Sequence, residues 1–260
     1  MPIGDSYKHL AKNKIRRFLI NTLGTDDLHS HIRLRPVINF LKKYMKQKNV
    51  FFKIIEIGCG NGVNAFELAK IKNSKFSYVG FDIDKNCINV ANELAEKLNI
   101  DHYLKFINVD VSKYEFDNNN NSFDIALLVD FLEHVVDPKA ILNNLKQKLK
   151  KNGIFIVSVP TRNYSKVFGK KFHHMIGHVT EGFGLYELQE IFRDVGAELL
   201  YYKYNTGMIS NLGCAVYYRI VTKQKLLRIL KIALLYPFSY LDIINHSKIS
   251  STLFAVFVKK

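Results

Sequence analysis

The chain carries, at residues 54–69, the stretch Ile54-Ile55-Glu56-Ile57-Gly58-Cys59-Gly60-Asn61-Gly62-Val63-Asn64-Ala65-Phe66-Glu67-Leu68-Ala69. This order predicts a buried strand that runs into a glycine-rich turn and then a helix. Three glycines in the spacing GxGxG let the backbone adopt positive φ and approach a ligand closely, and the start of the helix offers N–H groups without helical partners. The stretch therefore indicates a nucleotide-binding turn, although its spacing differs from the GxGxxG of dinucleotide-binding folds.

Three further predicted strands each end in an acidic residue. They are predicted at residues 77–82, 104–110 and 123–130, and they end at Asp82, Asp110 and Asp130. Because a parallel sheet presents its strand ends at one edge, the carboxylate of Asp82 can accept both hydroxyls of a ribose. Asp110 is placed to accept from an exocyclic amine. A single acid at such a position is more often a loop or helix-cap residue, but four strands in order with this chemistry favour a nucleotide site.

On these residues the chain resembles the class I S-adenosylmethionine-dependent methyltransferases, over residues 50–205 and 251–260. The matching stretches are Glu56-Ile57-Gly58-Cys59-Gly60-Asn61-Gly62, Phe81-Asp82-Ile83-Asp84, Asn108-Val109-Asp110-Val111 and residues 128–138, which are similar to the family's LEHV-DP signature. The resemblance implies the cofactor S-adenosylmethionine, with Asp82 on the ribose, Asp110 and Val111 on the adenine, and the glycine-rich loop beneath the methionine portion. The residues expected to bind the cofactor are Glu56, Gly58, Cys59, Gly60, Asn61, Gly62, Asp82, Ile83, Asp110, Val111 and Asp130.

Length and composition fit one large α/β domain with added segments. The 260 residues are 48% hydrophobic, which is ample for a core. The three cysteines, Cys59, Cys87 and Cys214, show neither CxxC spacing nor even pairing, so a reducing cytoplasm is the expected setting. No apolar segment precedes the first basic residues as in a signal peptide, and no uncharged apolar run is long enough for a membrane-spanning helix.

The net charge of +15 is unevenly distributed. Residues 1–50 carry 11 basic and 3 acidic side chains, and residues 203–260 carry 9 and 1, so each end contributes +8. The middle, residues 51–202, has 18 basic and 19 acidic side chains. Basic ends on a nearly neutral body point to an anionic partner, either a membrane surface or a polyanion, but a general bias toward lysine and asparagine explains them equally well.

The alternation of strands and helices predicts a Rossmann-like α/β fold with a mostly parallel seven-stranded sheet and helices on both faces. Residues 51–205 together with 251–260 form the predicted methyltransferase domain. In it, the strand at residues 198–204 pairs with the last strand, at residues 253–258.

Two helical additions flank this domain in the prediction. Residues 1–50 form an N-terminal helical cap, with helices at 6–22 and 33–48 and a polar turn between them, and in this family such helices commonly form part of a lid over the cofactor. Residues 206–250 form a helical insertion between the last two strands.

The insertion has an amphipathic pattern. Lys225, Arg228 and Lys231 fall three residues apart on one face of a predicted helix whose other positions are mainly apolar. Such a helix suits the interface of an anionic membrane, so residues 222–246 are a candidate peripheral contact with the inner membrane face. An ordinary helix packed on the body accounts for the same pattern, and so does a dimer interface.

Methyl transfer from a sulfonium is an in-line displacement whose rate comes largely from alignment and from exclusion of water, and a hydroxyl acceptor also needs a general base. Two groups of residues can supply one: Asp130, Glu133 and His134 after the fourth strand, and His173, His174 and His178 after the fifth. We predict Glu133, His134 and His178 as candidate catalytic residues, and favour His178 as base or substrate contact.

Asp130, Glu133, His134 and His178 are also candidate ligands of a divalent cation, which would orient an acceptor hydroxyl and lower its pKa. This spacing is similar to quinone-precursor O-methyltransferases and small-RNA 2′-O-methyltransferases, except that Asp130 replaces a glutamate and reaches less far. Glu133 and His134 are also explained as the family signature, which many members without a metal share.

The expected activity is S-adenosylmethionine-dependent O-methylation of a small-molecule or lipid-linked acceptor, such as a glycolipid or an isoprenoid. A second hypothesis is a metal-dependent RNA 2′-O-methyltransferase whose basic ends bind phosphates. A third is a non-catalytic scaffold, against which the retained glycines and acids of the cofactor site argue. Candidate walls of an acceptor pocket, which are equally explained as core residues, are Tyr164, Phe168, Phe172, Phe183 and Tyr186.

Overall fold

The structure, a computed structural model, describes residues 28–72, 75–114, 122–169, 177–219, 242 and 246–260. The strands in this part of the chain are β1 (Phe52–Ile57), β2 (Phe76–Asp82), β3 (Leu104–Asn108), β4 (Phe123–Val129), β5 (Leu149–Pro160), β6 (Ala197–Tyr204) and β7 (Thr252–Lys259). They form one sheet in the order β3-β2-β1-β4-β5-β7-β6. Neighbouring strands are parallel except at β7, which runs antiparallel to both β5 and β6. The predicted seven-stranded, mostly parallel sheet is confirmed, and so is the pairing of the last two strands.

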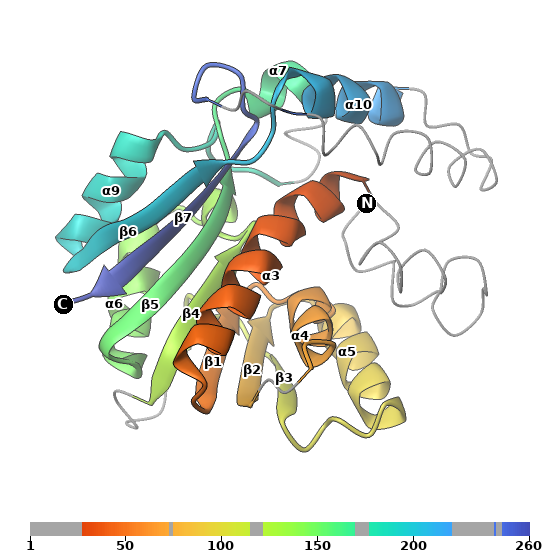
Figure 1. The fold of residues 1–260 in the computed structure, drawn as a ribbon, viewed down its shortest axis with the longest axis vertical. Coiled ribbons are helices and arrows are strands. Elements are labelled where there is room, and N and C mark those ends of the chain that lie inside the picture. The colour runs from red at the N-terminus through yellow and green to blue at the C-terminus, as the bar shows by residue number, and fades with distance from the viewer. Residues whose placement is uncertain (1–27, 73–74, 115–121, 170–176, 220–241, 243–245) are drawn as a thin grey trace.

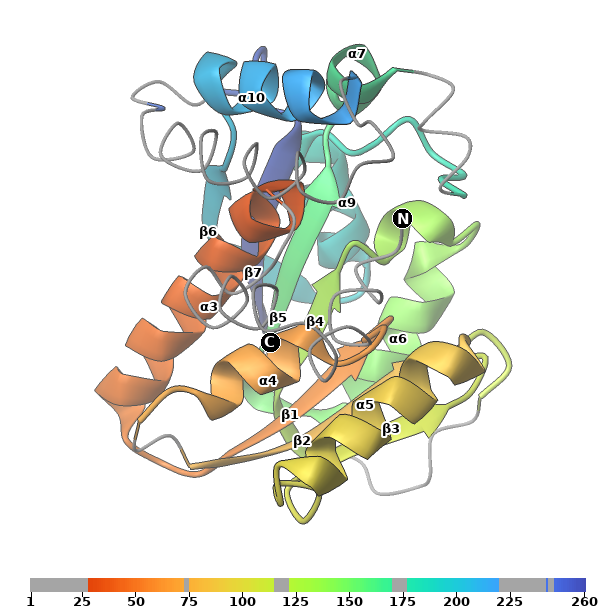
Figure 2. The ribbon, with the colours of Figure 1, turned by 90° about the vertical axis from the view of Figure 1, so that its right-hand side faces the viewer.

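Helices cover both faces of the sheet (Figures 1 and 2). One face carries α3 (Leu28–Lys48), α4 (Val63–Ala69) and α5 (Lys85–Lys97), and the other carries α6 (Pro138–Lys148) and α9 (Leu185–Asp194). Each face has its own apolar core. Alternation along β7 shows why, because Phe254 and Val256 join the first core while Ala255 and Phe257 join the second.

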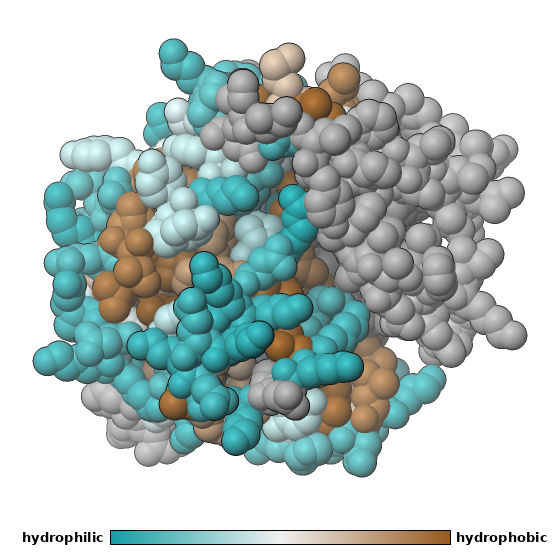
Figure 3. Space-filling view, in the orientation of Figure 1, coloured by the Kyte–Doolittle hydropathy of each residue, from teal (hydrophilic) through white to brown (hydrophobic). Residues whose placement is uncertain are grey.

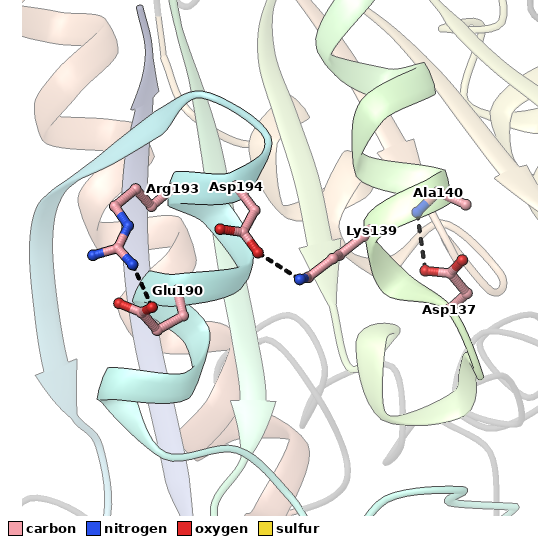
Figure 4. Close-up of polar contacts among 6 residues, drawn as sticks. All are labelled: Asp137, Lys139, Ala140, Glu190, Arg193 and Asp194. Atoms are coloured by element: carbon pink, nitrogen blue, oxygen red, sulfur yellow. Dashed lines mark hydrogen bonds and ion pairs between the residues drawn. The ribbon is translucent and has the colours of Figure 1, made fainter.

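Local signals fix where the helices begin. The side chain of Asp84 accepts hydrogen bonds from backbone N–H groups at the start of α5, and that of Asp137 does the same for α6, 3.1 Å from the nitrogen of Ala140. Figure 4 shows this cap beside an ion pair, at 2.5 Å, that joins Lys139 of α6 to Asp194 of α9. The two helices on this face are therefore connected at the surface as well as through the core.

The N-terminal cap is only partly described. The predicted helix at 33–48 is confirmed as α3, but it begins at Leu28, so residues 28–31 are helical and the prediction of a polar turn there is wrong. The buried side chains of Val37 and Leu41 pack α3 against the sheet, and this packing explains why a helix with Pro36 inside it persists. The predicted helix at 6–22 lies outside the described residues.

The insertion contributes α10 (Met208–Arg219), which packs on α7 (Tyr164–Phe168) beyond the ends of β5 and β6 (Figures 1 and 2). The carboxylate of Asp242 accepts hydrogen bonds from the backbone nitrogens of Gly207, Ile209 and Ser210, so it caps the start of α10. Lys225, Arg228 and Lys231 lie outside the described residues, and the membrane contact stays a prediction. Within the described ranges, none of the helices is long and apolar enough to cross a bilayer.

Candidate cofactor and acceptor site

The glycine-rich turn between β1 and α4 depends on glycine at each of its three positions. Gly58, Gly60 and Gly62 have φ values of 74°, 52° and 78°. A Cβ at Gly58 would lie 2.7 Å from the ring of Phe131, and one at Gly62 would lie 2.5 Å from the ring of Phe106. At Gly60, by contrast, none of the atoms described lies within 4 Å of the Cβ position. The loop is therefore packed from below at two glycines and open at the middle one, where a ligand can approach the backbone.

Asp82, at the end of β2, holds this loop. One oxygen of its carboxylate accepts a hydrogen bond from the nitrogen of Gly60 at 2.7 Å, and the other accepts from the nitrogen of Asp84 at 2.9 Å. Asp82 therefore lies beside the middle glycine, and its predicted contact with a ribose stays a prediction. Both strands end at this edge because β1 and β2 are parallel and in register.

Glu56 lies beneath the loop and is 1% exposed. Its carboxylate accepts hydrogen bonds from Nδ2 of Asn64, at 2.5 Å, and from the hydroxyl of Tyr78. Burial raises the pKa of Glu56 to about 7, against the opposing effect of these two hydrogen bonds. The structure thus places Glu56 as a brace between β1, β2 and α4, below the surface that a cofactor would contact.

The other predicted cofactor residues divide by exposure. Cys59 and Asn61 are buried, and burial raises the pKa of the Cys59 thiol well above its ordinary value, so it stays protonated. Ile83 is 71% exposed just beyond β2. Asp110 accepts hydrogen bonds from the backbone and hydroxyl of Ser112, which lower the pKa of Asp110. Neighbouring Val111 packs against the second core.

Asp130 takes a left-handed backbone conformation, with φ of 52°, directly after β4. Its carboxylate forms an ion pair with Arg33 of α3 at 2.7 Å, and both side chains are 12% exposed. Burial raises the pKa of Asp130, while the positive charge of Arg33 opposes the rise. This contact joins α3 to the end of β4.

A second cluster of polar side chains follows Asp130. Glu133 is fully buried, and its Oε1 lies 3.9 Å from Nε2 of His178. The rings of His134 and His178 meet edge to face with centroids 4.9 Å apart, and Nδ1 of His134 lies 3.1 Å from the carbonyl oxygen of Gly177. In the described part of the chain neither carboxylate oxygen of Glu133 has a hydrogen-bond partner. Burial and the charge of Asp130 raise the pKa of Glu133 well above its ordinary value.

The predicted convergence of Glu133, His134 and His178 is therefore observed, but Asp130 does not join it. One donor atom from each of the three residues lies within 4.8 Å of the others, whereas the carboxylate of Asp130 is paired with Arg33. One carboxylate and two imidazoles fit a divalent transition metal, and a fully buried carboxylate without a hydrogen bond is compatible with such a ligand. His173 and His174 lie outside the described residues.

The aromatic residues proposed as pocket walls are mostly core. Tyr164, Phe168 and Phe183 are buried, and the ring of Tyr164 lies 5.3 Å from that of His178. Tyr186 is 75% exposed on α9, so it does not line an enclosed pocket, and Phe172 lies outside the described residues.

Sequence reasoning missed four supporting residues. Arg33 forms an ion pair with Asp130, and the ring of Phe131 lies against Gly58. Asn64 and Tyr78 donate hydrogen bonds to Glu56. Only Asn64 gave a local signal, because a polar residue on the buried face of α4 needs a partner.

Comparison with known proteins agrees with this geometry. The sequence model of a family described as a methyltransferase domain matches residues 49–233. A ubiquinone biosynthesis O-methyltransferase of Rickettsia typhi is 27% identical over 133 residues, which are 51% of this chain and 50% of that protein. The chain spans about half the length of the first curated relatives it matches.

Solved structures share the fold at low identity. An S-adenosylmethionine-dependent methyltransferase from Mesorhizobium loti superposes with a TM-score of 0.56 and 13% identity, covering 85% of this chain and 100% of that one. The cyclase SpnF superposes with a TM-score of 0.61 and 16% identity, covering 89% and 82%. Because the fold also serves a cyclase, it does not by itself establish methyl transfer.

The chain belongs to the methyltransferase-domain family, within the class I S-adenosylmethionine-dependent methyltransferases. Its residues also fit the cofactor. The loop is open at Gly60, where a side chain would obstruct a ligand, and an acid stands beside it at the end of β2.

Proposed function

We propose that the protein transfers a methyl group from S-adenosylmethionine to a hydroxyl of a small-molecule or lipid-linked acceptor. The observation that carries the proposal is the contact between the nitrogen of Gly60 and Asp82, at the same edge of the sheet as the cluster of Glu133, His134 and His178. The loop and Asp82 would hold the cofactor, and the cluster would receive the acceptor. When bound, S-adenosylmethionine supplies a methyl group on a positively charged sulfur, which an aligned hydroxyl oxygen can attack.

His134 is the residue we propose as proton acceptor. A carbonyl oxygen can only accept, so the contact with Gly177 places the hydrogen of the neutral imidazole on Nδ1 and leaves the lone pair on Nε2. His134 is exposed, whereas the side chain of His178 is 3% exposed. Because an acceptor can reach it more easily, His134 is favoured over His178 as the base. His178 and Glu133 would then position His134 rather than act on the acceptor.

Cofactor binding is tested first, by calorimetric titration with S-adenosylhomocysteine. We expect the Asp82→Asn variant to bind about tenfold more weakly or worse, because it loses a charged acceptor at the loop. Asp194→Asn, which alters an acid in a surface ion pair on α9, is the matched control and should bind as the unmodified protein does. Absence of heat and of thermal stabilisation with the unmodified protein would overturn the proposal and favour the scaffold hypothesis.

The acceptor is tested with S-adenosylmethionine carrying a labelled methyl group. Relatives named for ubiquinone biosynthesis make a hydroxylated quinone precursor the first acceptor to offer, beside a lipid-linked sugar and a short RNA. We expect His134→Ala to lose about two orders of magnitude in kcat with unchanged S-adenosylhomocysteine affinity. His102→Ala, at an exposed histidine before β3, is the control. Transfer to RNA alone would replace the small-molecule proposal with the nucleic-acid one.

A further inference from the structure

A groove of about 580 Å³ lies between α3 and the edge strand β6, on the face of the sheet shown in Figures 1 and 3. In Figure 3 the hydrophilic side chains of α3 run down the middle of this face, and hydrophobic atoms lie beside them over β6 and β7. The lining residues of α3 recur at helical spacing from Ile32 to Gln47, so one stripe of the helix forms a wall. A groove of this volume suits a drug-sized molecule and is small for a protein segment.

The groove has aromatic walls. Phe40 of α3 stacks on Tyr44 at 5.7 Å and on Tyr201 of β6 at 6.1 Å, and its ring centroid lies 5.8 Å from that of Phe254. Tyr201 remains 44% exposed despite these contacts. Burial of such exposed aromatic faces against an apolar or aromatic ligand is energetically favourable.

The groove is also positively charged on both sides. Arg35 and Lys43 line it from α3, and Lys203 lines it from β6. Among the described residues, neither Lys43 nor Lys203 has an acidic partner within ion-pair distance. The acid in the lining, Asp242, is occupied by three backbone nitrogens at the start of α10. The charge of the lining therefore complements an anion.

One buried polar side chain in the lining is unsatisfied. Asn205, at the end of β6, is 7% exposed, and in the part of the chain that the structure describes neither its amide nitrogen nor its carbonyl oxygen has a hydrogen-bond partner. A buried amide without partners is costly, and a polar group of a bound ligand would remove that cost.

From these four features we propose that the groove is a binding site for a monomeric anionic amphiphile, whose apolar or aromatic body lies on Phe40 and Tyr201 and whose anionic head lies between Lys43 and Lys203. This site is separate from the glycine-rich loop, and its occupancy does not depend on methyl transfer.

The test uses 1-anilinonaphthalene-8-sulfonate, an aromatic anion that fluoresces in apolar surroundings, with the full chain saturated with S-adenosylhomocysteine to cover the cofactor site. Absence of tryptophan leaves the signal free of indole fluorescence. We expect saturable binding, displaced by monomeric dodecyl phosphate but not by inorganic phosphate or by neutral dodecyl maltoside. Displacement by anionic phosphatidylglycerol vesicles but not by monomeric dodecyl phosphate would show a membrane contact and would overturn the proposal.

Paired variants locate the site. The double variant Lys43→Gln and Lys203→Gln should bind the probe about tenfold more weakly, whereas Lys46→Gln, an exposed lysine of α3 outside the groove, should not change it. Tyr201→Ala should weaken binding, whereas Tyr202→Ala, the neighbouring tyrosine of similar exposure that does not line the groove, should not. Circular dichroism confirms that each variant folds. Equal affinity in folded groove and control variants overturns the assignment.

Discussion

Replacement of Glu56 by glutamine tests how the cofactor loop is braced. The carboxyl group of Glu56 is fully buried under the loop, where it meets Asn64 and Tyr78, and burial raises its pKa from 4.5 to about 7. In the unfolded chain the group loses its proton near its ordinary pKa. Between these two values the folded protein therefore holds a proton that the unfolded chain has released, and stability falls as pH rises.

The size of this effect follows from the two pKa values. Each unit of difference corresponds to about 1.4 kcal/mol, so ionisation of Glu56 should remove about 3 kcal/mol of unfolding free energy between about pH 4 and about pH 8. Glutamine is neutral at every pH and of similar shape, so the Glu56→Gln variant should lose this part of the pH dependence. At about pH 8 the variant should be the more stable protein.

Urea unfolding followed by far-ultraviolet circular dichroism, repeated across this pH range, measures the difference. Asp130 and Glu133 also have raised pKa values, but they are present in both proteins and their effects largely cancel. Glu93→Gln, at an exposed glutamate of α5, is the control and should keep the slope of the unmodified protein. If the unmodified protein and Glu56→Gln show parallel pH profiles, Glu56 is ionised in the fold and the reasoning about the brace fails.

Three other substitutions or treatments have definite expected results. Gly62→Ala combines a left-handed φ with a ring 2.5 Å from the new Cβ, and should cost about 2–4 kcal/mol of unfolding free energy in urea. Gly60→Ala should cost about 1–2 kcal/mol, because its Cβ meets no described atom, and yet should weaken S-adenosylhomocysteine binding in calorimetry. Equal losses of stability in the two variants would contradict the packing difference. Arg33→Met leaves the largely buried carboxylate of Asp130 without its ion pair and should lower the unfolding free energy by about 2–4 kcal/mol at neutral pH. The further change Asp130→Asn should recover part of this stability. If the effects of the two substitutions are fully additive, the two charges do not interact. Removal of metals with EDTA should leave methyl transfer intact if His134 acts as the base. Loss of activity that zinc or manganese restores would instead identify the histidine cluster as a metal centre.

Sequence reasoning succeeded where the signal is local. The glycine spacing predicted the turn, because the positive φ values that it needs depend on residues a few positions apart. It failed at the start of α3, where His29, Ser30 and His31 are polar and yet helical, since packing of the following turns extends the helix.

For the candidate site, the sequence placed Glu133, His134 and His178 in one region but assigned Asp130 to the same cluster. Spacing along the chain shows that side chains can lie close together, but it does not show which of several possible partners each side chain binds in the folded protein. Here α3 brings Arg33, almost a hundred residues earlier in the chain, within 2.7 Å of Asp130. The hydrogen bond from Tyr78 to Glu56 was missed for the same reason, because Tyr78 belongs to another strand.

The sequence alone determined the class of fold, the pairing of the last two strands and the glycine-rich turn, since periodicity, glycine spacing and strand-end acids are encoded within short segments. Only the tertiary structure decided which side chains share a partner, where burial raises the pKa of Glu56 and Glu133, and that α3 and β6 enclose a basic aromatic groove. These properties depend on distances between segments far apart in the chain, and the packing of two faces on one sheet sets those distances.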